Sequence, residues 1–158
     1  MKPARILVID DDDSVRKVMS AALEDEGYKV DLAETGTQAI EKSKSEFYNM
    51  ALIDIRLPDM EGTRLLSELK ETTPKMVKII VTGYPSMQNA IEAVKRGADD
   101  FVVKPFKMEV VLETIKRHLD KQEKEKRYSE DRVKEFIETR VSEQAAEDRE
   151  KRSKKTKA

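Results

Sequence analysis

The sequence contains no cysteine and only one histidine among its 158 residues. Without cysteine, neither a disulfide framework nor a thiolate metal site can form. No apolar run approaches the roughly 18 residues that a membrane-spanning helix needs, and residues 1–5 lack the apolar segment of a signal peptide. These absences predict a cytoplasmic protein with no membrane partner.

The sequence also lacks an excess of charge of one sign. Its 31 Lys and Arg residues balance 32 Asp and Glu residues, so the formal net charge is -1 although 40% of the residues are charged. This balance gives no overall attraction to nucleic acid or membrane. All five glycines and all five prolines fall within residues 1–105, and charged residues dominate from residue 119. We therefore predict a folded domain over residues 1–119 and a charged C-terminal extension over residues 120–158.

Five short apolar runs alternate with helical patterns in the predicted domain. The runs occupy residues 5–9, 29–32, 50–53, 77–81 and 100–103. The helical patterns occupy residues 14–26, 37–45, 62–71, 86–96 and 107–118. The first, third and fourth runs are continuous and rich in Ile and Val, which is typical of strands covered on both faces. This alternation predicts an α/β fold with a parallel sheet between two layers of helices.

Polar side chains directly follow four of the five apolar runs. They are Asp10, Asp11, Asp54, Thr82 and Lys104. Because ligands bind beyond the carboxyl ends of the strands in such sheets, we expect these side chains to share one edge. Carboxylates brought together require a compensating cation or proton. An all-oxygen cluster suits a hard divalent ion, with Mg²⁺ as the first expectation and Mn²⁺ or Ca²⁺ as alternatives.

The chemistry of this cluster indicates phosphoryl transfer. A carboxylate beside Mg²⁺, a lysine and a hydroxyl is equipped to attack phosphorus and to carry an acyl phosphate. Taken singly, an Asp after a strand is more often a helix N-cap or a turn residue. The coincidence across four strands favours a site.

Four motifs occur in order along the domain: ILVIDDDDSVR, ALIDIRLPDMEG, IIVTGY and ADDFVVKPF. With these motifs, the chain resembles a response-regulator receiver domain of two-component signal transduction over roughly residues 4–119. The resemblance implies a (βα)5 flavodoxin-like, doubly wound sheet of five parallel strands in the order 2-1-3-4-5. It further implies a stand-alone receiver, since no motif of an output domain follows.

The resemblance assigns roles to the acidic residues. Asp54 corresponds to the phosphoacceptor. Asp11 would ligate Mg²⁺ directly, together with Asp54 and the backbone carbonyl of Arg56, and Asp10 would act mainly through water. A second register, with Asp11 and Asp12 as the acidic pair, stays open.

Further roles follow from the same resemblance. Thr82 and Lys104 would contact the phosphoryl oxygens, and Thr82 and Phe101 occupy the switch positions, with Phe where Tyr is common. Arg56 and Tyr84 stand where the family modulates the lifetime of the phosphoryl group. The single histidine, His118, is expected to be structural.

The extension has no enzyme motif and no DNA-binding motif. Glu–Lys pairs spaced four residues apart favour a solvated helix, and one short apolar stripe offers a surface for packing on the domain or for a homodimer through the last helix and the tail. The stripe consists of Val133, Phe136, Ile137 and Val141. Sustained heptads are absent. The basic end, residues 151–157, suits nucleic acid, although solvated termini of this kind are common.

We therefore expect a response regulator, and not an enzyme. It would accept a phosphoryl group on Asp54 from a histidine kinase or histidine phosphotransfer protein and signal through phosphorylation-dependent protein–protein interaction. One alternative is a Mg²⁺-dependent phosphatase-like hydrolase with Asp54 as transient nucleophile, but Arg56 replaces the second acid of that class. Another is a DNA-associated regulator acting through the basic tail, against which the missing helix-turn-helix counts.

Overall fold

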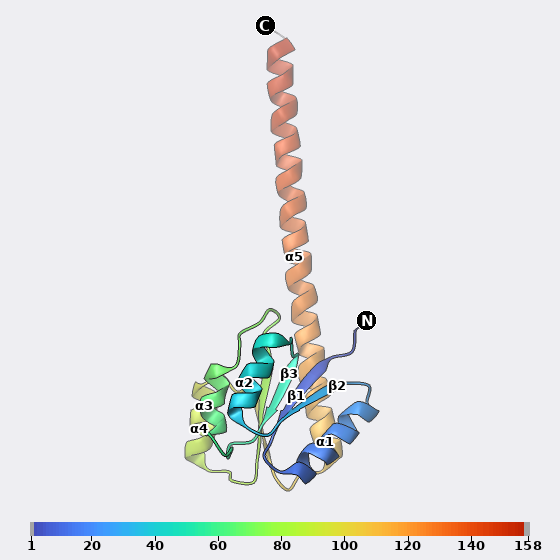
Figure 1. Ribbon diagram of the computed structural model, residues 1–158. Helices are drawn as coiled ribbons and strands as arrows, with labels where there is room; N and C mark the ends of the chain where they lie inside the picture. Colours follow the sequence, from blue (N-terminus) through green and yellow to red (C-terminus); the bar gives the residue numbers. More distant parts are fainter. Residues whose placement is uncertain (1, 157–158) are drawn as a thin grey trace. The chain divides into compact units, whose positions relative to one another are not determined.

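The computed structural model describes residues 2–156, in which five strands alternate with five helices (Figure 1). The elements are β1 (Arg5–Ile9), α1 (Asp13–Asp25), β2 (Lys29–Ala33), α2 (Gly36–Ser45), β3 (Met50–Ile53), α3 (Gly62–Glu68), β4 (Val77–Thr82), α4 (Met87–Lys95), β5 (Asp100–Val103) and α5 (Met108–Thr156). The strands pair in parallel in the order β2-β1-β3-β4-β5. The predicted doubly wound sheet is confirmed.

Alternate residues of the central strands supply two separate cores. On β1, Leu7 and Ile9 belong to the core that α2, α3 and α4 complete, whereas Ile6 and Val8 belong to the core that α1 and α5 complete. Side chains on successive strand residues point to opposite faces of a sheet, so continuous apolar strands require helices on both sides. Each fully buried aliphatic side chain contributes about 1.5–3 kcal/mol. This burial makes the sheet a rigid platform for the polar strand ends.

Polar caps and glycines define the ends of the helices. The side chains of Asp12, Thr35 and Ser86 each accept a hydrogen bond from a backbone N–H in the first turn of α1, α2 and α4. Gly27 and Gly97 follow α1 and α4 with φ angles of 92° and 94°, which glycine adopts without strain. These residues fix where the loops around the sheet begin.

The loop between β3 and α3 is held by two kinds of contact. The Asp59 carboxylate accepts hydrogen bonds from the backbone N–H groups of Gly36 and Thr37, each at 2.9 Å, and from the Thr37 hydroxyl at 2.6 Å. These bonds, with that from the Thr37 hydroxyl foremost, lower the pKa of Asp59 to about 2. Where α3 begins, the backbone of Gly62 packs closely on the start of the loop: a Cβ on Gly62 would lie 2.0 Å from the backbone oxygen of Asp54. Only glycine fits there.

The last helix is longer than the pattern over residues 107–118 predicts, because no Gly or Pro interrupts it. It spans 49 residues. The chain separates into two compact units, the first reaching Gln122 and the second beginning at Glu123, and α5 contributes to both. The division into residues 1–119 and 120–158 stays a prediction. No helix in the described range is both long and apolar enough to cross a membrane.

A buried polar contact holds α5 at the edge of the sheet opposite the strand ends that carry the acidic residues. The Gln122 side-chain amide donates hydrogen bonds to the backbone oxygens of Asn49 (2.9 Å) and Lys75 (2.8 Å) and accepts one from the Asn49 side chain at 3.1 Å. Gln122 is only 6% exposed. It satisfies backbone groups that precede β3 and β4, which explains why α5 packs on the domain beyond Leu119.

We expect Asp59→Ala to lower the free energy of unfolding near neutral pH by about 1 kcal/mol, because it removes the hydrogen bonds at the start of α2. A depressed carboxyl pKa stabilises the fold above the unfolded-state value of 3.8, and this stabilisation is lost as the pH falls through about 2. The difference in free energy of unfolding between the wild type and Asp59→Ala should therefore decrease as the pH falls from 3.8 toward 2. Urea unfolding across this range measures it.

Glu61→Ala is the matched control for this substitution. Glu61 precedes α3, yet its side chain makes no cap hydrogen bond there. Equal destabilisation by the two substitutions would contradict the capping role of Asp59.

Candidate functional site

The polar residues that follow β1, β3 and β5 meet the end of β4 at one edge of the sheet. Asp10 follows β1, Asp54 follows β3, Thr82 ends β4 and Lys104 follows β5. The last residues of β1 and β3 are register partners, so the two aspartates leave adjacent strands at the same level. The parallel register thus sets the spacing of the groups at this edge.

Three carboxylates form a cluster at this edge. Oxygen atoms of Asp10, Asp11 and Asp54 all lie within 4.8 Å of one another, with Asp10 and Asp54 buried and Asp11 exposed. Asp12 is outside the cluster, because its side chain caps α1 at 3.1 Å from the backbone nitrogen of Val15. The acidic pair that joins Asp54 is therefore the first two of the four consecutive aspartates.

Lys104 joins the two buried carboxylates. Its Nζ lies 2.7 Å from Asp10 Oδ2 and 3.2 Å from Asp54 Oδ2. Burial alone would lower the pKa of Lys104, but the hydrogen bond to Asp10 and the charges of both carboxylates outweigh burial and raise this pKa. Lys104 therefore stays protonated and compensates part of the negative charge.

That compensation is incomplete at Asp54. Burial and then the negative charge of Asp10 raise the pKa of Asp54 above 3.8, against the opposing effects of Lys104 and the backbone N–H of Arg56 at 3.3 Å. An ionised Asp54 is therefore costly in the free chain. An added cation or the loss of one negative charge would relieve this cost.

The donor set fits a hard divalent cation. All three side chains offer carboxylate oxygens, and no histidine or cysteine belongs to the cluster. Such an acidic triad is typical of receiver domains and has the composition of a metal site. The backbone of Arg56 lies beside it, and ligation through the Arg56 carbonyl stays a prediction.

The buried side chain of Arg16 holds the loop that carries the acidic residues after β1. The Arg16 side chain is buried, and its Nη1 donates to the backbone oxygen of Asp10 at 2.7 Å, while Nη2 lies 3.2 Å from Asp13 and 3.5 Å from Glu34. A buried arginine with several oxygen partners fixes a loop more firmly than an exposed ion pair does. The sequence signal for this role is the arginine six residues after Asp10.

Two residues at the rim make a contact that the sequence did not predict. The guanidinium carbon of Arg56 lies 3.7 Å from the centroid of the Tyr84 ring, and Tyr84 is 51% exposed. The backbone N–H of Tyr84 also donates to the Thr82 hydroxyl at 3.1 Å. The only signal in the sequence is that each residue stands two positions after a site residue, Asp54 or Thr82.

The remaining predicted residues are Thr82 on β4, Phe101 on β5 and His118 on α5. Phe101 is partly buried against the core on the α2–α4 side of the sheet, and Thr82 is fully buried at the end of β4. The Nε2 atom of His118 lies 2.8 Å from Asp100, which Arg117 also contacts at 3.1 Å. The histidine thus makes a side-chain contact with Asp100 that ties α5 to β5.

Comparison with known proteins agrees with this geometry. A solved receiver domain protein (CheY-like) from Methanospirillum hungatei JF-1 is 45% identical, with a TM-score of 0.76 over 78% of this chain and 99% of that chain. A response regulator from Burkholderia pseudomallei, solved with a phosphorylated aspartic acid, a calcium ion and citrate, is 28% identical, with a TM-score of 0.68 over 78% of this chain and 72% of that chain.

A longer relative matches over the same region. The transcriptional regulatory protein ZraR of Escherichia coli K12 is 37% identical over 114 residues, which are 72% of this chain and 26% of that protein. The chain thus spans about a quarter of the length of this curated relative. The family model of the response regulator receiver domain matches residues 6–116. Receiver domains are typically phosphorylated on an aspartate, have a cognate histidine kinase and are not enzymes in the usual sense. By its fold, its acidic cluster and this match, the chain belongs to the response regulator receiver domain family.

Proposed function

We propose that the chain is a phosphoryl acceptor, in which Asp54 takes the phosphoryl group of a histidine kinase or a histidine phosphotransfer protein. The observation that carries the proposal is the position of the Asp54 carboxylate, which lies within 4.8 Å of the carboxylates of Asp10 and Asp11 and 3.2 Å from the Lys104 ammonium. A nucleophile flanked by a metal-binding cluster and a fixed cation is the arrangement that phosphoryl transfer requires.

In this proposal Asp11, Asp54 and the backbone carbonyl of Arg56 would hold Mg²⁺ directly, Asp10 would act mainly through water, and Mn²⁺ is the alternative ion. When bound, it would neutralise the negative charge of the carboxylates and of the incoming phosphoryl oxygens. An Asp54 oxygen attacks phosphorus, a P–O bond forms, and the P–N bond to the kinase histidine breaks, with its electron pair leaving on the imidazole nitrogen. Lys104 then turns from the Asp54 carboxylate to a phosphoryl oxygen.

The Thr82 hydroxyl is the second group proposed to contact the phosphoryl oxygens. Its oxygen already accepts from the Tyr84 N–H, so its own proton is free to donate. Thr82 is fully buried at the end of β4, beside the edge that carries Asp54. Phe101, partly buried beside the same strand, is proposed to change position together with Thr82.

We propose that the phosphorylated chain signals by binding a protein partner in the cytoplasm. The exposed face of α4 supports this output, because it presents three apolar side chains at helical spacing: Met87 (78% exposed), Ile91 (48%) and Val94 (74%). Exposed apolar patches of this kind mark interaction surfaces. A phosphatase-like activity is disfavoured by Arg56, whose side chain stacks on Tyr84 where that class needs a second acid.

We expect acetyl phosphate with Mg²⁺ to add one phosphoryl group to the wild-type chain and none to Asp54→Asn, because the proposal makes Asp54, beside the acidic pair and Lys104, the single acceptor. Intact-protein mass spectrometry measures the product. Asp12→Asn is the control, since asparagine keeps the cap of α1 and Asp12 lies outside the cluster. Equal labelling of Asp54→Asn and wild type would refute the acceptor assignment.

In metal-free buffer, Asp54→Asn should raise the melting temperature near neutral pH. The folded-state pKa of Asp54 lies above the unfolded value of 3.8, so ionised Asp54 destabilises the fold once the pH exceeds both values. Below 3.8 the carboxyl is protonated in both states, and the advantage of the variant should vanish. Mg²⁺ should stabilise the wild type more than the variant. Thermal unfolding at several pH values tests this, and a lower melting temperature for the variant at neutral pH would contradict it.

Arg56 and Tyr84 are expected to slow hydrolysis of the phosphoryl group by covering its approach. Tyr84→Ala should increase the rate of dephosphorylation about two- to fivefold, which corresponds to the roughly 0.5–1 kcal/mol of an exposed cation–π contact. Tyr84→Phe keeps the ring and should behave as wild type. The decay of the phosphorylated species can be followed by mass spectrometry, and equal rates for the Ala and Phe variants would contradict a role of the ring contact.

A further inference from the structure

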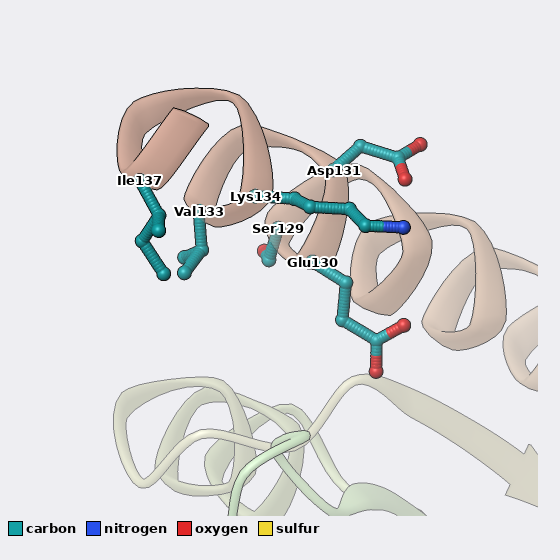
Figure 2. A pocket seen from close by; sticks show the side chains of 6 residues that line it. All are labelled: Ser129, Glu130, Asp131, Val133, Lys134 and Ile137. Carbon is teal, nitrogen blue, oxygen red and sulfur yellow. The ribbon is translucent and has the colours of Figure 1, made fainter. Parts of the chain in front are cut away.

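The part of α5 that begins at Glu123 carries an apolar stripe on an otherwise charged helix. Val133, Phe136, Ile137 and Val141 are 58%, 60%, 55% and 63% exposed. Figure 2 shows Val133 and Ile137 pointing to the same side of the helix, with Ser129 next to Val133. Most of the stability of helices in proteins comes from packing of an apolar face. This exposed stripe is therefore a candidate surface for binding a partner.

The residues around the stripe are arranged symmetrically about Ile137. At 100° per residue, nine side chains between Glu123 and Lys151 lie within about 40° of the direction of Ile137. They are Glu123, Lys126, Glu130, Val133, Ile137, Val141, Gln144, Asp148 and Lys151. These nine residues, the symmetric face, stand four, seven, eleven and fourteen positions on either side of Ile137. In two antiparallel copies centred on Ile137, each of these positions therefore lies opposite another position of the set.

When two copies of the helix run in opposite directions, opposite charges of the symmetric face also lie opposite each other. An antiparallel second copy places Glu123 opposite Lys151, Lys126 opposite Asp148, Glu130 opposite Gln144, Val133 opposite Val141 and Ile137 opposite Ile137. A parallel, in-register copy would instead set each of these charges against itself. Opposite charges across a helix pair favour an orientation and like charges disfavour it.

We propose that the symmetric face pairs with the symmetric face of a second copy of this chain, antiparallel, with the two-fold axis at Ile137. Such an interface is isologous and closes as a dimer. From Glu123 to Lys151 the paired helices run for about 42 Å, at about 1.5 Å per residue. Three apolar layers form the centre, and polar pairs flank it on both sides.

The neighbours of the symmetric face are compatible with this pairing. Arg140 lies over the ring of Phe136 at 5.0 Å, and Phe136 stands about 100° from Ile137, outside the symmetric face. Within one chain, Glu123 pairs with Arg127 at 3.0 Å and Asp148 accepts from Gln144 at 3.2 Å. Exposed pairs of this kind contribute little, so exchanging them for contacts with a second copy costs little. The pairing does not depend on phosphorylation of Asp54.

Disulfide cross-linking tests the orientation directly, because the chain has no cysteine of its own. We expect an equimolar mixture of Glu130→Cys and Gln144→Cys chains, one carrying a tag that alters its mass, to form mixed disulfide dimers under mild oxidation. Each variant alone should form few disulfide dimers. Glu135→Cys, about 160° from Ile137 on the helix, is the control.

The yields on a non-reducing gel decide the orientation. Mixed dimers in clear excess over both single variants and over the control support the antiparallel pair. Faster cross-linking of either variant with itself would overturn the orientation. A mixed yield no higher than that of Glu135→Cys would overturn the interface.

Sedimentation equilibrium of variants with exchanged charges measures the affinity of the dimer independently of cross-linking. Lys126→Glu should weaken the dimer about tenfold, since it places like charges opposite Asp148 at two symmetric positions. Adding Asp148→Lys should restore the affinity. Lys124→Glu makes the same change in net charge on the opposite helix face and should have little effect. A wild-type chain that sediments as a monomer at all concentrations, or a Lys126→Glu chain that dimerises as wild type does, would overturn the proposal.

Discussion

The ammonium group of Lys104 between two buried carboxylates is the interaction on which the site depends. Asp10, Asp54 and Lys104 come from the ends of three different strands, and they meet only because β1, β3, β4 and β5 are adjacent and parallel. One cation against three carboxylates leaves the cluster short of positive charge. The fold tolerates this shortage because the two helix-covered cores stabilise the sheet independently of its polar edge. A divalent cation would compensate this shortage.

The segment from Thr82 to α4 links this edge to the exposed apolar face of α4. Tyr84 donates its N–H to Thr82, contacts Arg56 with its ring, and accepts a hydrogen bond from the Asn89 side chain at 3.2 Å. Few residues separate the fully buried Thr82 from Met87, where α4 begins. In the proposed function, a displacement of Thr82 toward a phosphoryl group would pull on this short segment and alter what α4 presents to a partner.

Strand positions and their polar ends could be predicted from the sequence because both are local: a continuous apolar run, then an acid, a hydroxyl or a lysine. Contacts between segments far apart in the chain could not. Nothing in the residues near Asp59 indicates that its carboxylate binds Gly36 and Thr37, and nothing near Gln122 indicates that it binds Asn49 and Lys75. The choice between two registers of the acidic pair needed the cap contact of Asp12. A helical extension after residue 118 was predicted and is confirmed, but its end could not be predicted, because the absence of a helix breaker does not say where a helix ends.

Two carboxyl groups five residues apart, Asp54 and Asp59, differ in what sets their charge. Burial dominates at Asp54 and raises its pKa, whereas hydrogen bonds from the start of α2 hold the pKa of Asp59 at about 2. Acidification therefore protonates Asp54 before Asp59. Over that interval the hydrogen bonds of Asp59 still attach the loop to the start of α2 while Asp54 has lost its charge.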